Sequence, residues 1–485
     1  MYLGIDLGTS GVKVIILDEQ DNLLAQASSS LEVSRPAPLW SEQNPMDWWK
    51  STSEAIEIIK AKHPKLLASI KGIGLSGQMH GATLLDKNNE IIRRAILWND
   101  GRSANQCEQI ERSEPNSRDI TGNIAMPGFT APKLLWLKQN EPSNFAKVAK
   151  VLLPKDYLRF LITGDFASDM SDSAGTLWLD VANRKWSPEM LKTTFLTEQH
   201  MPKLYEGTDI TGVVKSEIAE LWGIDQVPVV AGAGDNAAGA AGVGVVSPNQ
   251  GFLSLGTSGV YFVANERYLP NPDGAVHTFC HCLENTWHQM SVVLSAASCL
   301  TWVTKLTGFK DENALLEEVQ KCDFSKPNTV TFLPYLTGER TPHNNPNAKG
   351  VFFGMDNDTN AAVLGRAVLE GVAFAFADGQ QVLIDAGTKI DNVTVIGGGA
   401  KSPLWGKILA SVLNRPLTYR EGSEVGPAFG AARLARIGVE KSTAEQVCSK
   451  GKVTQVIEPE PVMQEFYAKQ YTQYKALYQS VKNHF

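Results

Sequence analysis

Apolar residues alternate with small or polar ones over residues 3–7 and again over residues 12–14, and a Gly-Thr-Ser-Gly turn separates the two runs. A period of two places successive side chains on opposite faces of a strand, so the pattern predicts a β-hairpin with a polar, glycine-rich tip. In the first strand this alternation places Asp6 on the same face as Gly4 and Gly8. The backbone N–H groups and hydroxyls of such a tip suit a phosphate.

The same pattern recurs 248 positions later, over residues 253–262. Ser254 replaces Asp6 in this second copy, and Tyr261 replaces Lys13. The backbone of the tip is therefore duplicated, whereas the ionisable groups are not. This difference predicts two phosphate loops that face one ligand, with a metal ion held only by the first. The alternative, two homologous edge hairpins with turn glycines, explains a single copy well and two copies poorly.

The segments after the first hairpin predict a third strand and a helix. Alternation over residues 22–31 suits the strand, and Asn44 and Pro45 suit the N-cap and first position of a helix that continues to about Lys62. Three strands and a helix in this order begin a ribonuclease-H-like fold. Two short strands that end in polar loops, where chemistry often takes place, follow at residues 71–75 and 95–98.

The later half of the chain repeats this order. A buried strand over residues 227–230 enters a glycine-rich loop in the first half, and residues 393–396 enter the loop Gly397-Gly398-Gly399 in the second. We therefore predict an N-terminal domain over residues 1–245 and a C-terminal domain over residues 246–485. The less regular residues at about 103–215, within the N-terminal domain, are expected to form an insertion that covers the cleft of that domain. Further helices are predicted at 132–139, 154–161, 361–385 and 403–413.

Composition narrows the possible partners. A chain of 485 residues is too long for one core, and 43% hydrophobic with 20% charged residues is typical of globular proteins. The net charge of −7, without basic runs interleaved with aromatic residues, argues against nucleic acid, so the ligand should be small. We expect a cytoplasmic protein without a membrane segment, since no apolar run has spanning length and the six cysteines follow no disulfide framework.

Two homologous domains that turn glycine-rich hairpins toward a central cleft are typical of the α/β, actin/hexokinase-type superfamily. A P-loop enzyme is excluded because no Gly-x-x-x-x-Gly-Lys-Ser/Thr motif occurs. Phosphoryl transfer from ATP requires bound phosphates, a divalent ion and an acceptor for the proton of the attacking hydroxyl. Asp6 suits Mg²⁺, through water, because magnesium retains part of its hydration shell. The predicted nucleotide-binding residues are Gly8, Thr9, Ser10, Gly11, Lys13, Gly256, Thr257, Ser258, Gly397, Gly398 and Gly399, although Lys13 is also explained as a solvated strand lysine.

Asp235 is the candidate general base, because a carboxylate between glycines at the start of a helix can face the cleft. An N-cap that satisfies its own helix explains this residue equally well. His80 and Asn236 can hydrogen-bond sugar hydroxyls, although a loop histidine beside a glycine is as often a solvated bystander.

A second group of candidates for the sugar pocket follows the strand at 95–98. These candidates are Trp98, Asp100 and Arg102. An Asx-turn with a local salt bridge explains them nearly as well, so both explanations stay open here.

Several motifs together resemble the FGGY family of carbohydrate kinases. They are residues 5–10, Gln78-Met79-His80-Gly81, residues 126–136, Gly234-Asp235-Asn236, residues 255–259 and residues 338–343. The resemblance extends from residue 1 to about residue 435 and is strongest to members that phosphorylate xylulose. The pair Met79-His80 is its most specific feature, since glycerol kinases carry a different, arginine-bearing loop there.

The resemblance implies ATP-dependent phosphorylation of D-xylulose on its 5-hydroxyl, with Met79 and His80 contacting the sugar, Asp235 accepting the proton and Asp6 required for activity. It also implies a homodimer. Another ketose or polyol, such as ribulose, stays open as the substrate, because contacts to sugar hydroxyls cannot be counted from sequence. Two further alternatives are a non-catalytic sugar sensor and an actin-like ATPase or chaperone; the latter would have no use for a base in a sugar pocket.

Overall fold

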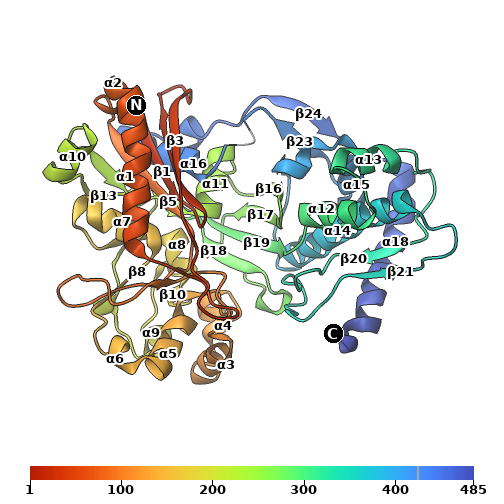
Figure 1. The fold of residues 1–485 in the computed structure, drawn as a ribbon, viewed down its shortest axis with the longest axis horizontal. Coiled ribbons are helices and arrows are strands. Elements are labelled where there is room, and N and C mark those ends of the chain that lie inside the picture. Colours follow the sequence, from red (N-terminus) through yellow and green to blue (C-terminus); the bar gives the residue numbers. More distant parts are fainter. Residues whose placement is uncertain (423–424) are drawn as a thin grey trace.

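The two predicted hairpins lie in separate β-sheets in the computed structural model, which describes residues 1–422 and 425–485. Figure 1 shows these sheets in two lobes, with most of the first half of the chain in one lobe and most of the second half in the other. Within the described residues each sheet has seven strands. The first sheet contains β1 (Tyr2–Leu7), β2 (Gly11–Leu17), β3 (Leu23–Ser30), β5 (Gly72–Gly77), β13 (Ile210–Val213), β14 (Pro228–Val230) and β15 (Ala233–Gly234). The second contains β16 (Gln250–Leu255), β17 (Gly259–Asn265), β18 (His277–Cys280), β19 (Trp287–Val293), β22 (Asn392–Ile396), β23 (Leu417–Arg420) and β24 (Val453–Ile457).

The two sheets have matching strand orders. The order is β3-β2-β1-β5-β14-β13 in the first sheet, where β15 also pairs with β5, and β19-β17-β16-β22-β23-β24 in the second, where β18 is added beside β19. In both, an antiparallel set of three strands is extended by two parallel strands and then by one antiparallel strand. This agreement confirms the prediction of an α/β protein built from two homologous ribonuclease-H-like domains.

Three helices have the bounds that local sequence signals predict: α1 (Pro45–Lys62), α14 (Ala361–Asp385) and α15 (Pro403–Leu413). Asn44 caps α1 by accepting a hydrogen bond from the Met46 N–H at 3.3 Å, and Ser402 caps α15 through the Trp405 N–H at 3.3 Å. Proline at the first or second position of α1 and of α15 fixes the entry of the chain.

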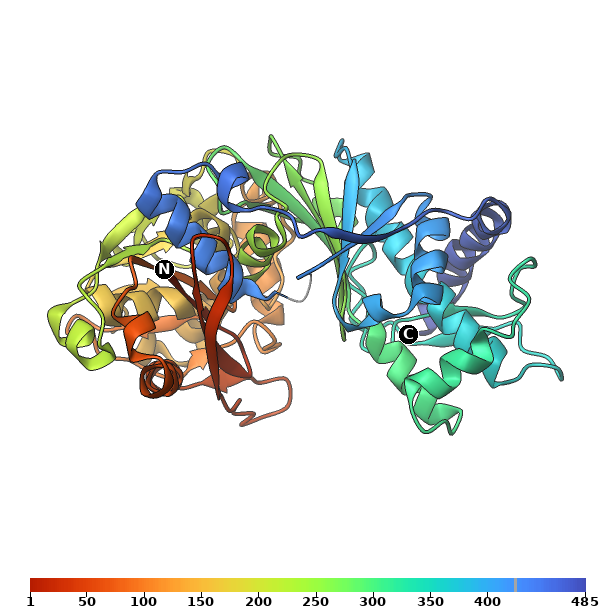
Figure 2. The same cartoon turned by 90° about the horizontal axis from the view of Figure 1, so that it is seen from above.

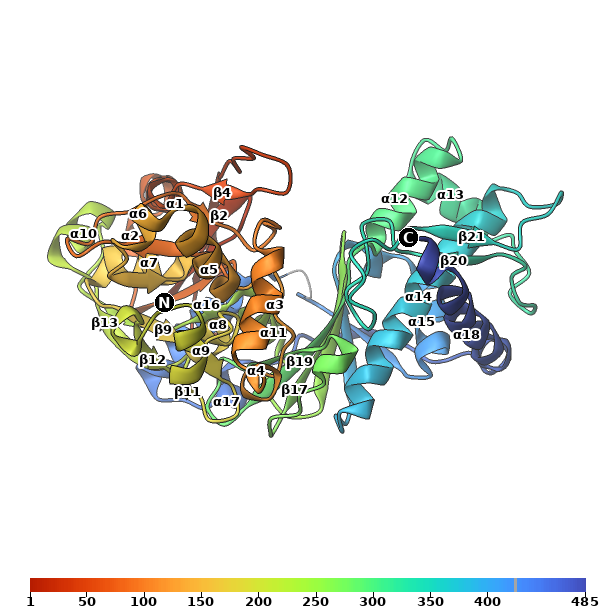
Figure 3. The same cartoon turned by 90° about the horizontal axis from the view of Figure 1, so that it is seen from below.

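The insertion and its surroundings consist of short elements that cover the first lobe, as Figure 3 shows from below. In the first half these are α2 (Pro64–Leu67), β4 (Glu42–Gln43), β6 (Thr83–Leu85), β7 (Ala95–Ile96), α3 (Ala104–Ser113), α4 (Ser117–Thr121), α5 (Thr130–Asn140), α6 (Pro142–Phe145), β8 (Lys150–Leu152), α7 (Pro154–Thr163), β9 (Ala167–Asp169), α8 (Met170–Ala174), β10 (Leu179–Asp180), β11 (Lys185–Trp186), α9 (Pro188–Thr193), β12 (Lys203–Tyr205) and α10 (Ser216–Trp222). The second half of the chain contains α12 (Ala297–Leu306), α13 (Glu312–Val319), β20 (Thr331–Leu333), β21 (Val351–Phe353) and α18 (Pro461–Val481) in the second lobe (Figure 1), and the short helix α17 (Ala444–Val447). Single 3₁₀ turns occupy Glu198–His200, Pro272–Gly274, Gly398–Lys401 and Lys482–His484.

Helix α16 (Pro427–Glu440) comes late in the sequence but packs on the first sheet, where Figures 1 and 2 show its blue ribbon beside the red strands. A Cβ atom on Gly74 would lie 1.8 Å from the carbonyl oxygen of Ala431, and one on Gly4 would lie 2.0 Å from that of Ala428. Only glycine permits this approach of helix backbone to strand. On its other side α16 packs against α11 (Asp235–Val243), so the later half of the chain completes the first lobe around the helix that carries Asp235.

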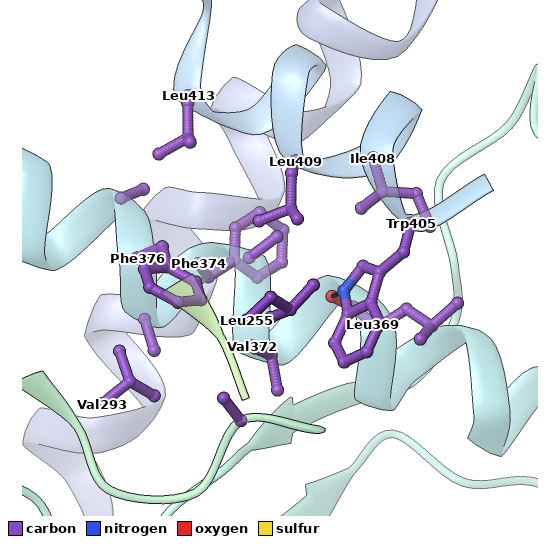
Figure 4. Close-up of a cluster of buried hydrophobic side chains, with 14 of the residues drawn as sticks. Leu255, Val293, Leu369, Val372, Phe374, Phe376, Trp405, Ile408, Leu409 and Leu413 are labelled. Atoms are coloured by element: carbon purple, nitrogen blue, oxygen red, sulfur yellow. Dashed lines mark hydrogen bonds between the residues drawn. The ribbon is translucent and has the colours of Figure 1, made fainter. Parts of the chain in front are cut away.

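The core of the second lobe fixes the base of the second hairpin tip. Figure 4 shows Leu255 of β16 packed among side chains from α14 and α15, including Phe376 and Trp405. The indole Nε1 of Trp405 donates to the carbonyl oxygen of Leu369 at 3.1 Å, which satisfies its one polar group inside the core. Because Leu255 is the last residue of its strand, this packing holds the following Gly256 in place.

Candidate active site

Asp6 and Asp235 meet at one edge of the first sheet. Asp6 of β1 is opposite Ser76 of β5, and Ala233 of β15 pairs with the same Ser76 from the other side. The carboxylates of Asp6 and Asp235 therefore both lie at the carboxyl ends of these parallel strands. Ligands in open α/β sheets bind at such strand ends.

The charge of Asp235 makes ionisation of Asp6 less favourable. Burial and the neighbouring charge of Asp235 raise the pKa of Asp6 to about 7, from an ordinary value of 3.8. Lys13, on the neighbouring strand β2, opposes this shift. Within the described residues the Oδ1 atom of Asp6 is buried without a hydrogen-bond partner. A shielded carboxylate oxygen of this kind is the donor that a hydrated divalent cation prefers, so the residues fit the predicted metal.

Asp235 is the first residue of α11, and the residue in the N-cap position is Gly234. The Oδ1 atom of Asp235 accepts hydrogen bonds from the backbone N–H of Asn236 at 2.8 Å and from its side-chain Nδ2 at 2.9 Å. Burial raises the pKa of Asp235 to about 6, against these two hydrogen bonds, which lower it. The alternative of a simple N-cap is therefore disfavoured, and the carboxylate has a pKa near neutral pH, where a general base is most effective.

Met79 and His80 lie beside this pair, immediately after β5. The His80 Nδ1 atom lies 2.5 Å from the carbonyl oxygen of Gly175, so Nδ1 carries the proton and Nε2 is left as an acceptor. Burial lowers the pKa of His80 to about 3, which keeps the ring neutral. A Cβ atom on Gly175 would lie 2.8 Å from the Met79 Cε, and one on Gly234 would lie 3.0 Å from its Sδ. Met79 is thus wedged between two glycines, one of which precedes the candidate base.

Trp98 differs from the two charged residues that follow it. Its side chain is 48% exposed, and its Nε1 donates to the Thr9 hydroxyl at 2.9 Å, which places the indole beside the first hairpin tip. Asp100 and Arg102 are buried and bound to each other, with 2.7 Å between Arg102 Nη2 and Asp100 Oδ2, and Arg102 also pairs with Glu42 at 2.8 Å. The Arg102 N–H completes an Asx-type turn on Asp100 at 3.0 Å. The structure thus favours the salt-bridged turn for this pair.

The second hairpin tip, at residues 256–258, is joined to the start of α12 by backbone hydrogen bonds. The carbonyl oxygens of Gly256 and Thr257 accept from the N–H groups of Ala297 and Ala296 at 2.8 Å and 2.9 Å, so the tip is anchored to the start of α12. Thr257 and Ser258 themselves are exposed.

The glycine loop after β22 lines a pocket of about 580 Å³ between α12, α13 and α15. Gly397 adopts a φ of +91°, and a Cβ atom on Gly399 would lie 2.5 Å from the Leu255 Cγ, so both positions require glycine. The pocket is lined in part by Leu300, Leu316, Gly398, Gly399 and Trp405. Polar and charged side chains, among them Glu312 and Gln320, complete the lining, so the pocket offers both apolar surface and hydrogen-bonding groups to a planar base.

Two residues near the sugar side were assigned no role from sequence. The Arg340 Nη1 atom lies 3.1 Å from the His277 Nε2, and the charge of Arg340 contributes to the lowered pKa of His80. Arg340 belongs to the motif at residues 338–343, but no local pattern connects that motif with Met79-His80. Only the folded chain brings them together.

Comparison with known proteins gives matches over both halves of the chain. Residues 1–242 match the N-terminal domain of the FGGY family of carbohydrate kinases, and residues 251–439 match its C-terminal domain. The chain belongs to the FGGY family of carbohydrate kinases. As a family member it is a phosphotransferase that acts on a sugar, with ATP as the phosphoryl donor.

Relatives and solved structures cover nearly the whole chain. A xylulose kinase of Escherichia coli (strain K12) is 57% identical over 447 residues, 92% of each chain, and one of Klebsiella pneumoniae is 54% identical over 90% of each. The crystal structure of a xyloylose kinase from Brucella ovis covers both chains fully with a TM-score of 0.96 and 48% identity. That of a xylulose kinase from Rhodospirillum rubrum covers 99% of each with a TM-score of 0.92 and 26% identity. Within residues 1–422 and 425–485, no helix combines the length and apolar character needed to cross a membrane.

Proposed function

We propose that this protein transfers the γ-phosphoryl group of ATP to the 5-hydroxyl of D-xylulose, with Asp235 as the general base. The observation that carries the proposal is the pair Asp6 and Asp235 at one sheet edge, next to Met79 and His80, in a chain that is 57% identical to a xylulose kinase. In such a pair one carboxylate, Asp235, accepts the proton, and the other, Asp6, binds the metal ion that contacts the phosphates.

Proton transfer falls to Asp235. Its carboxylate accepts two hydrogen bonds from Asn236, which orient it, and its pKa of about 6 leaves it ionised but basic at neutral pH. As the sugar hydroxyl attacks, its proton passes to the Asp235 carboxylate. The neutral His80, with Nε2 as an acceptor, and Met79 hold the sugar in position.

Asp6 would hold Mg²⁺ through water, and the ion would offset negative charge on the transferring phosphoryl group. The backbone and hydroxyls of the tips Gly8–Gly11 and Gly256–Ser258 would bind phosphates, and Lys13 would add a positive charge beside Asp6. Residues Gly397–Gly399 would bind adenosine in the adjoining pocket. Because the reaction uses ATP, we expect the protein to act in the cytoplasm. We also expect a homodimer, which analytical ultracentrifugation would detect.

A coupled assay of ADP release across pentuloses, hexuloses and polyols tests the substrate. We expect the highest kcat/KM with D-xylulose, and a higher value with ribulose would replace it as the substrate. The absence of turnover with every sugar would favour the non-catalytic sensor.

Asp235→Ala tests the base. We expect kcat to fall by about 10²–10⁴, as for other positioned general bases, with ATP affinity nearly unchanged. Turnover close to that of the wild type would refute the assignment.

The asymmetry of the two hairpins gives a matched comparison. Asp6→Asn should impair magnesium-dependent turnover far more than Ser254→Ala, the change at the corresponding position of the second hairpin. Equal losses would contradict a metal site confined to the first hairpin.

A further inference from the structure

A buried cluster of charged side chains lies under the loop that leads to Asp235. This Lys155 cluster consists of Lys155, Asp156 and Arg159 on α7 and of Asp169 and Asp172 at the start of α8. The Lys155 Nζ atom lies 2.6 Å from Asp156, 2.7 Å from Asp169 and 3.1 Å from Asp172, and none of these side chains is exposed to solvent. Burying five charged groups costs free energy, which the ion pairs within the cluster and its hydrogen bonds to the surrounding backbone offset.

The cluster contacts the loop first through Arg159. The Nη1 atom of Arg159 donates to the carbonyl oxygen of Val230 at 2.6 Å, and its Nη2 donates to that of Ala231. These carbonyls belong to the end of β14 and the residue after it. The guanidinium therefore fixes the point where the chain leaves the sheet, four residues before Asp235.

The second contact runs through Ser171. Its hydroxyl donates to the Asp169 carboxylate, and its oxygen accepts the backbone N–H of Gly234 at 3.2 Å. Asp169 in turn is paired with Lys155. A continuous chain of polar contacts thus connects the centre of the cluster with the residue directly before Asp235.

The loop at residues 231–234 needs such support because its own side chains, from alanine and glycine, make no hydrogen bonds and few packing contacts. Gly232 has a φ of +75°, and a Cβ atom there would lie 1.9 Å from the carbonyl oxygen of Leu75, so the position requires glycine. Glycine is also the most flexible residue, and the helix that follows is built largely from alanine and glycine. The position of a catalytic side chain on such a segment depends on how firmly the surrounding residues hold the backbone of the segment.

We propose that the Lys155 cluster, acting through Arg159 and Ser171, positions the backbone of residues 230–234 and thereby aims Asp235 at the attacking hydroxyl. Ser171 is then a positioning residue. The proposal rests on the proposed function, because it needs Asp235 to act on the sugar.

The test compares two serines on the same short helix. Ser171→Ala removes the acceptor for the Gly234 N–H, whereas Ser173→Ala removes an equally buried hydroxyl whose one hydrogen bond within residues 1–422 and 425–485 is to Ser168, at 2.9 Å. We expect Ser171→Ala to lower kcat by about 10- to 100-fold with KM for the sugar changed less than about threefold, as when a reacting group is misplaced. Ser173→Ala should keep kcat within about twofold, and thermal unfolding of the two variants should differ little.

A double-mutant cycle separates this proposal from the proposed function. In the Asp235→Asn background, Ser171→Ala should cause no further loss, because the group that it misplaces is already inactive. Full activity of Asp235→Asn alone would refute the base assignment. An inactive Asp235→Asn combined with unchanged kcat in Ser171→Ala, equal losses in both serine variants, or additive losses in the cycle would each overturn the positioning role.

Discussion

Replacing Asp6 by asparagine should stabilise the free protein while it abolishes efficient catalysis. The pKa of Asp6 is about 7 in the folded protein, against an ordinary value of 3.8. Below about pH 4 the side chain is protonated in both the folded and the unfolded state, so it does not affect the free energy of unfolding. Between about pH 4 and pH 7 the unfolded chain releases its proton first, and the folded state is destabilised by an amount that grows with pH and is constant above pH 7.

The size of this effect follows from the shift. About three pKa units correspond to about 4 kcal/mol, and solvent screening of a half-buried side chain reduces this to about 2–4 kcal/mol. The asparagine side chain of the variant carries no charge at any pH, so the variant should gain this amount at pH 8. For a cooperative unit of the size of the first domain, about 2 kcal/mol corresponds to a rise in Tm of roughly 4–8 °C.

Thermal unfolding of the magnesium-free, nucleotide-free protein at pH 4 and pH 8 measures the effect. Ser254→Ala is the matched control, because it changes the corresponding residue of the second sheet without changing a charge, and its effect should not depend on pH. A variant that is no more stable than the wild type at pH 8 would refute the reasoning. An equal gain at both pH values would refute the electrostatic cause, because only the ionised carboxylate is penalised.

Three further changes test other parts of the structure. Gly74→Ala would place a Cβ atom 1.8 Å from the Ala431 carbonyl oxygen, and we expect a loss of about 1–3 kcal/mol or more in urea unfolding; an unchanged midpoint would contradict the close packing of α16. Arg102→Ala should cost about 3–5 kcal/mol, because it leaves the buried carboxylate of Asp100 without its ion-pair partner, and a raised KM for the sugar without lost stability would instead support a sugar contact. Gly399→Ala should raise KM for ATP several-fold, since its Cβ atom would displace Leu255 beside the adenosine pocket, and an equal rise in KM for the sugar would place the defect elsewhere.

Local chemistry made much of the secondary structure predictable. Asn44 followed by Pro45, and Ser402 followed by Pro403, are cap signals that act within one helical turn, and both helices begin where these signals predict. The repeated hairpin was equally visible, because a strand with period two and a glycine tip needs no distant partner to be recognised. The homology of the two domains followed from this repeat, and the matching strand orders confirm it.

The ambiguous site residues could not be resolved in this way. In sequence, a salt-bridged turn explains Asp100 and Arg102 nearly as well as a sugar pocket does, and it is the buried Glu42, 60 residues before Arg102, that favours the turn. Whether Asp235 is the N-cap of its helix or the first residue within it depends on a shift of one residue in the helix boundary. Local sequence patterns do not define boundaries this closely.

The sequence by itself determined the elements, their repetition and the carboxylate at the end of the first strand, because these depend on the spacing of neighbouring residues. Only the tertiary structure decided that α16 completes the first lobe, that Arg340 lies near His80, and that the Lys155 cluster supports the loop before Asp235. The physical reason is that hydrophobic periodicity specifies which face of an element is buried, but not which distant element covers it. The buried ion pairs and the glycines that pack against the backbone of another element join residues far apart in the sequence. Their partners are therefore known only from the folded structure.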